Sequence, residues 1–109
     1  MPKYLFRSNY TPEGIRGLLR EGATSRRDVA RRAAESVGGT LEAFYYGFGE
    51  TDVFIIVDLP DNVSAAALKL ATAATGTITG ETVVLLTPEE IDQATVRQTE
   101  YRAPGAGPQ

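Results

Sequence analysis

The side chains that could carry chemistry are few, because the 109-residue chain contains no histidine and no cysteine. This composition excludes a Ser-His-Asp triad, thiolate nucleophiles, disulfides, and metal or haem sites that depend on His or Cys ligands. Any acid–base or binding chemistry has to use Asp, Glu, Lys, Arg, Tyr, Ser, Thr or Asn. We expect no metal ion and no other cofactor.

The candidate side chains lie in four segments with the alternation and composition typical of β-strands, at 3–10, 40–48, 52–59 and 77–86. In the first segment, Arg7 and Asn9 lie on the side opposite to Phe6, because successive side chains of a strand alternate between faces. A charged side chain rarely lies beneath a helix without a partner. We therefore assign Arg7 to a sheet face that no helix covers.

Strand pairing would gather polar side chains on that open face. Pairing of the first strand with the third would bring Asn9 near Asp52, and the fourth strand would lie on the other side of the first. Apolar or aromatic walls around a few convergent polar groups describe a small-molecule site. The candidate catalytic bases are Asp52 and Tyr46, and the predicted ligand-binding residues are Arg7, Asn9, Tyr46, Phe54, Thr79 and Glu81.

Each candidate also has a structural interpretation that the sequence leaves open. Arg7 and Glu81 could form an ion pair across neighbouring strands. Asp52 could accept hydrogen bonds within its hairpin, and Tyr46 could be a core residue whose hydroxyl reaches the rim. Six arginines that follow the first strand favour a solvated helix face over a patch for an anionic partner: Arg16, Arg20, Arg26, Arg27, Arg31 and Arg32.

Two helices are predicted between the first two strands. Thr11 is a good N-cap and Pro12 suits the first helical position, so a short helix begins there and runs to about residue 21. Ser25 followed by Asp28 resembles a capping box, which predicts a second helix over about 26–37. Gly38 and Gly39 would end it.

Two more helices follow the third and fourth strands. The first has Asp61 or Asn62 as its cap and ends near Gly76. It would lay a narrow apolar stripe against the sheet: Val63, Ala66, Ala67, Leu70 and Ala74. A full capping box from Thr87 to Glu90 begins a short last helix to about residue 95. We expect one domain over residues 1–95 and a loose Pro- and Gly-rich tail over residues 96–109.

The element order β-α-β-β-α-β predicts an α+β fold of the ferredoxin-like kind. Right-handed crossovers place both helices on one face of a four-stranded antiparallel sheet with strand order 4-1-3-2. The apolar run at 53–57 indicates burial on both faces, so the open face needs a cover. A second copy would supply it and form a dimeric α/β barrel, through an apolar patch of Phe44, Tyr46, Phe48, Phe54 and Ile56.

Charge and hydropathy narrow the range of partners. The formal net charge of −3 is not that of a nucleic-acid-binding protein. No apolar run approaches the roughly 20 residues that span a bilayer, and we expect no secretory signal at the N-terminus. We expect no nucleic-acid partner, no membrane partner and a cytoplasmic location.

Several short motifs, in order, resemble the GYD domain family over roughly residues 3–95. They are Thr11-Pro12-Glu13-Gly14, Gly38-Gly39, Gly49-Glu50-Thr51-Asp52 and Leu59-Pro60-Asp61, with an Ala-rich helix after them. The resemblance implies a dimeric α/β-barrel fold, which small ligand-binding proteins and cofactor-free enzymes share, and no settled activity.

The hairpin departs from the family's Gly-x-Tyr-Asp motif at one position. Gly49 and Asp52 match, whereas Thr51 stands where the family has tyrosine. We expect Gly49 to adopt a positive φ, as one residue of a short hairpin loop usually does. If the barrel mouth is functional, Thr51 leaves room there for a larger ligand.

Three functions are compatible with these observations. We favour a homodimeric barrel that binds a small organic molecule. The alternatives are a cofactor-free isomerase, cyclase or oxygenase, in which Arg7 and Asn9 stabilise an enolate, and an assembly protein with a filled barrel. The sequence leaves open whether the protein is an enzyme.

Overall fold

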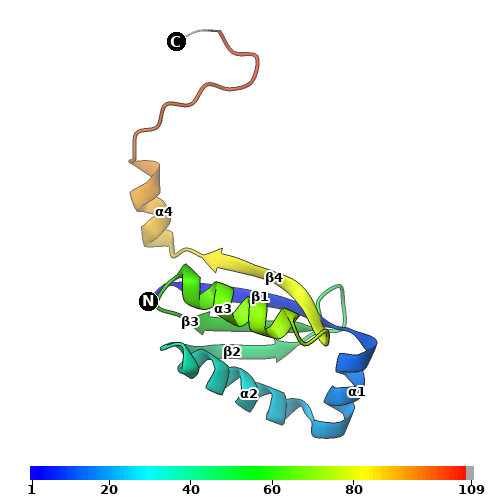
Figure 1. Cartoon of the computed structure of the whole chain (residues 1–109). Helices are drawn as coiled ribbons and strands as arrows, with labels where there is room; N and C mark the ends of the chain where they lie inside the picture. Colours follow the sequence, from blue (N-terminus) through cyan, green and yellow to red (C-terminus); the bar gives the residue numbers. More distant parts are fainter. Residues whose placement is uncertain (108–109) are drawn as a thin grey trace.

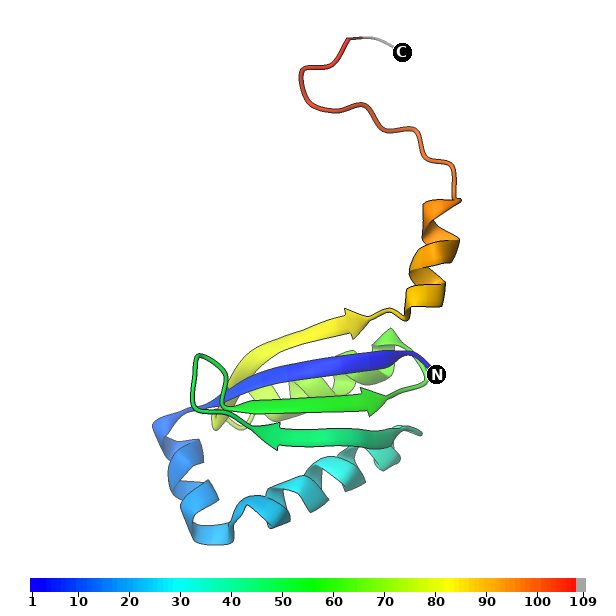
Figure 2. The ribbon, with the colours of Figure 1, turned by 180° about the vertical axis from the view of Figure 1, so that it is seen from behind.

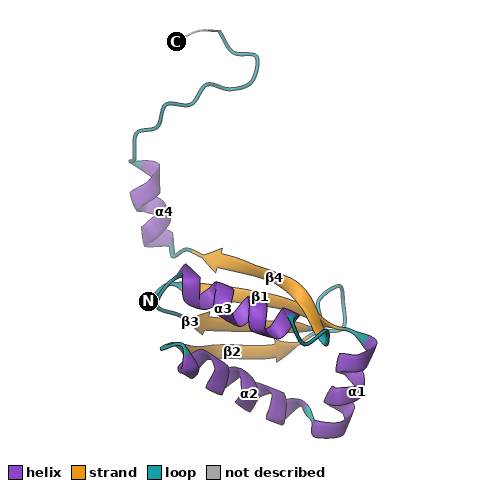
Figure 3. Ribbon diagram, viewed as in Figure 1, coloured by secondary structure: helices purple, strands orange, loops and turns teal. Residues whose placement is uncertain are grey.

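The computed structural model describes residues 1–107 and contains a four-stranded sheet with helices on one face (Figures 1 and 3). The strands are β1 (Lys3–Tyr10), β2 (Thr40–Tyr46), β3 (Val53–Asp58) and β4 (Ile78–Leu85). The helices are α1 (Pro12–Glu21), α2 (Ala23–Ser36), α3 (Asn62–Ala73) and α4 (Pro88–Thr95).

The sheet is antiparallel and has the order β2-β3-β1-β4, which is the predicted 4-1-3-2 read from the other edge. This confirms the α+β, ferredoxin-like fold. The central strand β1 sets the alignment of its neighbours, because Arg7 lies opposite both Phe54 of β3 and Glu81 of β4. Residues that lie opposite one another share a face of the sheet.

The covered face carries the core at one end of the sheet. Tyr4 is almost fully buried there beneath α2 and α3, among Ala34, Val57, Leu59 and Ala65. The Tyr4 hydroxyl donates a 2.6 Å hydrogen bond to Oδ1 of Asn62, the first residue of α3. Two alanines at the contact let the helices approach the sheet closely, so the core is made by a large aromatic ring against small helical residues.

The prediction that Phe44, Tyr46 and Phe48 lie on the open face of the sheet is wrong. In β2, Phe44 pairs with Ile55 and Tyr46 pairs with Val53, which places both aromatic residues on the covered face. Aromatic residues occupy both parities of β2, so alternation could not choose between them, and a bulge between Leu41 and Ala43 resets the parity. Phe48 lies beyond the strand in an exposed loop.

The predicted stripe on α3 is also wrong. Val63 and Leu70 are largely exposed, whereas Ala65 and Leu68 belong to the core or pack against it. The helix is apolar around most of its circumference, so its periodicity gives little information about the buried side. Phe54 and Ile56, in contrast, lie on the open face as predicted, opposite Arg7 and Leu5.

Two predictions about local backbone conformation are also wrong: the N-cap of α2 and the positive φ of Gly49. The cap of α2 is Gly22 at φ +87°, not Ser25, whose hydroxyl donates to Glu21 instead. One glycine in this conformation lets α2 begin as soon as α1 ends. Gly49 is not among the glycines with positive φ in residues 1–107. The loop between Tyr46 and Val53 has six residues, enough to reverse the chain without a left-handed one.

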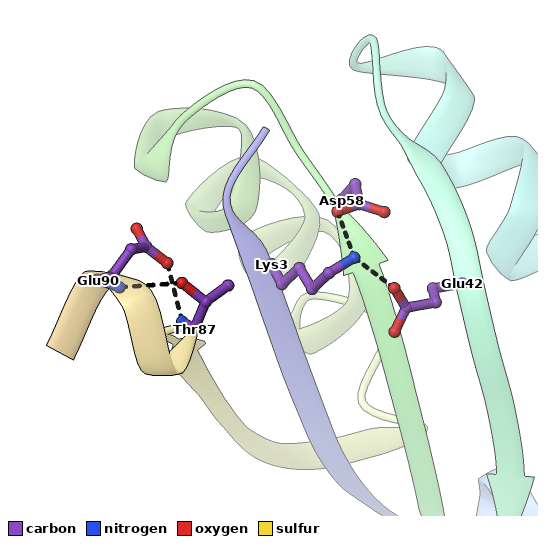
Figure 4. A network of polar contacts seen from close by, with 5 residues as sticks. All are labelled: Lys3, Glu42, Asp58, Thr87 and Glu90. Atoms are coloured by element: carbon purple, nitrogen blue, oxygen red, sulfur yellow. Dashed lines mark hydrogen bonds and ion pairs between the residues drawn. The ribbon is translucent and has the colours of Figure 1, made fainter. Parts of the chain in front are cut away.

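The last helix is specified locally and stands away from the sheet (Figures 1 and 2). Thr87 Oγ1 accepts from the Glu90 amide at 3.1 Å, and Glu90 Oε1 accepts from the Thr87 amide at 2.9 Å, which confirms the predicted capping box (Figure 4). Beyond α4 the chain has no further helix or strand through residue 107. Pro108 and Gln109, the end of the predicted tail, lie outside the described residues.

The close approach of α1 to the sheet gives a stability prediction. A Cβ on buried Gly14 would collide with the Thr77 carbonyl oxygen, whereas a Cβ on Gly17 would have only Arg20 Nη2 nearby, at 3.9 Å. We expect Gly14→Ala to lower the free energy of unfolding by about 1–3 kcal/mol. Gly17→Ala is the matched control and should be neutral or stabilising by up to about 1 kcal/mol. Urea denaturation measures both; equal effects would contradict the packing.

Candidate functional site

The predicted polar group on the open face exists, and its members bind mainly one another. Arg7 Nη1 donates to Glu81 Oε1 at 3.3 Å and Arg7 Nη2 donates to Thr51 Oγ1 at 3.3 Å. The cross-strand ion pair considered for Arg7 and Glu81 is therefore present. Two of the five guanidinium N–H donors are therefore engaged by protein partners, one of them the Glu81 carboxylate, which competes with an incoming anion.

Asn9 and Asp52 are adjacent, as predicted, and they fix the hairpin. The Asp52 amide donates to Asn9 Oδ1 at 2.8 Å, and Asp52 Oδ2 accepts from the Tyr10 amide at 3.0 Å. These bonds tie the start of β3 to the end of β1. The Asp52 carboxylate thus has a structural role in this arrangement. Thr79 lies opposite Asn9 on β4.

The rest of the open face is apolar and lies uncovered (Figure 2). Phe54 is 36% exposed and Tyr45, which lies opposite it, is 70% exposed. The remaining apolar residues on this face, placed by strand register, are Leu5, Ala43, Ile56, Val83 and Leu85.

A cluster of charged side chains lies at the Lys3 end of the open face. Lys3 Nζ binds Glu42 and lies 2.9 Å from Asp58 Oδ1 (Figure 4). Hydrogen bonds to Glu42 and then to Asp58 raise the pKa of the Lys3 ammonium. Charged or polar side chains therefore lie at both ends of an apolar strip.

The structure contains a cavity on the other face, which we call the helix-side cleft. It lies between the covered face of the sheet and the helices α2 and α3, next to the core, and has a volume of about 110 Å³. Its walls are mostly apolar or aromatic and include Phe6, Val29, Ala33, Phe44, Ile55 and Leu68. The core occupies the Tyr4 end of the covered face, and the helix-side cleft extends to the Tyr10 end.

Polar groups gather at one end of the helix-side cleft. Tyr10 and Arg26 line it, and the ring of Tyr46 stacks on Tyr10 with centroids 6.5 Å apart. The Tyr10 and Tyr46 hydroxyl oxygens lie 3.2 Å apart. Arg26 Nη1 lies 3.1 Å from Glu21 Oε1 at the end of α1. This end can supply a guanidinium and phenol hydroxyls to a bound polar group.

Tyr46 is a poor general base in this environment. Burial, followed by the hydrogen bond with Tyr10, raises the pKa of the Tyr46 phenol well above its usual value. The phenol therefore stays protonated at neutral pH. Tyr46 also lies on the opposite side of the sheet from Arg7, so the predicted ligand set does not form one group.

Sequence reasoning missed Tyr10, Arg26 and Phe44 as members of a cleft. Tyr10 has the same parity as Tyr4 and Phe6, which was a usable signal that it faces the helices. Arg26 gave no such signal, because it is one of several arginines in the same region.

The described residues suggest no metal centre and no membrane span. Within residues 1–107, no group of three or more acidic side chains is arranged to hold a metal ion. In the same part of the chain, no helix combines the length and hydrophobicity that crossing a membrane requires.

The fold and the cleft together define a small α+β protein of the ferredoxin-like class with one helix-covered and one open sheet face. A family comparison matches residues 4–95 to the GYD domain, so the chain belongs to the GYD domain family. No curated protein and no solved structure matches the chain.

The position where this chain departs from the family motif lies inside the protein. Thr51 is 9% exposed and its hydroxyl accepts a hydrogen bond from Arg7. The residue therefore lies against the open-face polar group rather than in bulk solvent.

The Tyr46 environment predicts a distinct alkaline titration. A pKa raised in the folded state means that the stabilising contribution of the protonated phenol is complete below the ordinary value of about 10 and is lost as the pH rises through the folded value. Absorbance titration should show a phenol that ionises above the ordinary tyrosine range, and Tyr46→Phe should reduce the amplitude of that late step. Tyr45→Phe, at a well-exposed tyrosine, is the control and should leave it in place.

Proposed function

We propose that this protein is a homodimeric binding protein that holds a small, mostly apolar organic acid in the helix-side cleft. The observation that carries this proposal is the coincidence of apolar walls with a polar end, where Arg26 and Tyr10 line the cleft and Tyr46 contacts the Tyr10 hydroxyl from outside it. Small-molecule sites combine apolar surroundings with few orienting polar groups. The open-face group around Arg7, in which we expected the ligand, lies outside this cleft, and none of its charged residues lines it.

The size and chemistry of the cleft limit the ligand. A cavity of about 150 Å³ accommodates benzene, so the volume of about 110 Å³ suits a short alkyl segment or part of one ring, with the remaining atoms at the open end. A carboxylate at that end would accept from the Arg26 guanidinium, which would exchange its contact with Glu21 for the ligand. Tyr10 would donate to the same group, and protonated Tyr46 would act through its hydrogen bond with Tyr10.

Binding is favoured over catalysis because the cleft lacks a base. No carboxylate is among the described residues that line it, and the raised pKa of Tyr46 keeps that phenol neutral. The other candidate base, Asp52, accepts a backbone hydrogen bond in the hairpin. General-base chemistry needs a group that is unprotonated near the operating pH and within reach of the substrate.

The dimer is proposed from the open face. A sheet with helices on one side only leaves the other apolar face in water, and here it includes Tyr45, Phe54 and Ile56. An exposed apolar patch of this kind with charged ends is typical of an interaction surface. A second copy is the simplest partner, since two such faces are self-complementary across a two-fold axis.

Carboxylate probes test the cleft. We expect benzoate and phenylacetate to bind by isothermal titration calorimetry, and Arg26→Gln to weaken them about tenfold. Benzamide should bind both proteins equally, because it lacks the charge. Ala33→Leu should fill the cleft and abolish binding, whereas Arg27→Gln and Ala66→Leu, at exposed positions, should not.

Two outcomes would overturn the assignment of the site. Loss of binding in Arg7→Gln with normal binding in Arg26→Gln would move the ligand to the open face. Absence of binding across a broad set of aryl and alkyl carboxylates in native mass spectrometry would remove the proposed ligand class.

An acidic substitution on the open face tests the dimer. Ile56→Asp should give a monomer or an unstable protein, because it places a carboxylate in the apolar interface. Val63→Asp, at an exposed position on α3, is the control and should leave the oligomeric state unchanged. Light scattering after size-exclusion chromatography measures both. A stable dimer of the Ile56→Asp protein would rule out this face.

A further inference from the structure

The segment after β4, residues 86–96, which we call the arm, exposes apolar side chains that its own fold does not cover. Leu86, Ile91 and Val96 are 57%, 45% and 79% exposed. The hydrogen bonds found for residues 86–107 all stay within that stretch. Among the described residues, none of them reaches the sheet or the helices α1, α2 and α3. Figures 1 and 2 show α4 leaving the edge of the sheet and extending away from it.

Local sequence signals nevertheless favour a helix in the arm. Proline at the first helical position and the reciprocal Thr87–Glu90 capping box both specify where α4 begins. A helix of eight residues is marginal in water on its own, and most helical stability in proteins comes from packing of an apolar side. Its exposed Ile91 is therefore explained best by a surface outside this chain's own fold.

Charge points to a particular surface. The helix α4 carries Glu89, Glu90 and Asp92 and no basic residue. The helix α2 carries four arginines against two carboxylates. No ion pair is found for Arg27 or Arg32 within residues 1–107, and Arg31 pairs with Asp28 at 2.8 Å on the exposed surface of the helix. An acidic helix and an arginine-rich helix are complementary.

Topology places the chain's own α2 at the opposite edge of the sheet from the arm. The strand order places β4, from which the arm leaves, at one edge of the sheet and β2 at the other. The helix α2 packs beside β2 (Figure 1), so about three strand spacings, roughly 14 Å, separate the two edges. When two such sheets stack about a two-fold axis that runs parallel to the strands, however, the β4 edge of one copy lies over the β2 edge of the other.

We propose that the arm of each copy binds the outer surface of α2 in the second copy, with Glu89 and Asp92 facing Arg27 and Arg31 and with Ile91 buried between the helices. This inference rests on the homodimer in the proposed function, and not on the ligand. The arms would fasten a dimer whose sheets supply the main interface. Arg27 and Arg31 are one turn apart, as a helix-on-helix contact requires.

The absence of native cysteine makes disulfide trapping a clean test. Full-length chains carrying Glu89→Cys alone and Arg27→Cys or Arg31→Cys alone are mixed, allowed to exchange subunits and oxidised. We expect a covalent heterodimer in the mixture with at least one α2 position. The control is Glu89→Cys mixed with Val63→Cys on α3, which should give little product.

Charge reversal gives an independent readout. Glu89→Arg or Arg27→Glu should raise the dimer dissociation constant about three- to fivefold at low salt, and the two changes together should restore it. Glu100→Arg, an acidic residue beyond the arm, is the control and should have no such effect.

The outcomes separate the arm from the dimer. A wild-type chain that is monomeric by light scattering would defeat the proposed dimer and the arm with it. A wild-type dimer that forms no trapped heterodimer and shows no charge rescue would overturn the arm alone. Efficient intramolecular disulfide formation at high dilution, in one chain carrying Glu89→Cys and Arg27→Cys, would show that the arm folds back on its own body and would also overturn it.

Discussion

The register of β1 against its two neighbours is the constraint on which the rest of the structure depends. It turns Tyr4 and Phe6 toward the helices and Leu5 and Arg7 toward the open side. A slip of one residue would exchange the faces of the strand and place the Arg7 guanidinium beneath the helices. The hydrogen bond from Tyr4 to α3 and the ion pair from Arg7 to β4 both exist only in this alignment.

The covered face is divided into a closed end and an open end by the size of its side chains. Small helical residues, Ala34 and Ala65, pack against Tyr4 and make a buried core. Toward Tyr10, the same face and the same two helices enclose the helix-side cleft instead. The cleft is thus a continuation of the core in which the small residues of α2 leave space, and its polar end coincides with the junction of α1 and α2 through Arg26 and Glu21.

The two faces divide the polar side chains into those that stabilise the fold and those available to a ligand. On the open face, Arg7 and Asp52 bind neighbouring strands or backbone groups and complete the hairpin. In the cleft, Tyr10, which hydrogen-bonds with Tyr46, and Arg26 lie beside an apolar volume. Membership of the GYD domain family agrees with the fold and leaves the ligand to be decided by these local arrangements.

Local signals in the sequence determined the number and order of the elements, the strand order, the α4 capping box and the placement of Arg7 beside Glu81. These depend on caps, alternation and crossover handedness, which act over short stretches or obey general rules. Only the tertiary structure decided that Phe44 and Tyr46 face the helices, since both parities of β2 are aromatic and a bulge sets the choice. It also decided where a cavity remains, because a cavity is the volume that packing leaves unfilled, and no single segment specifies that volume.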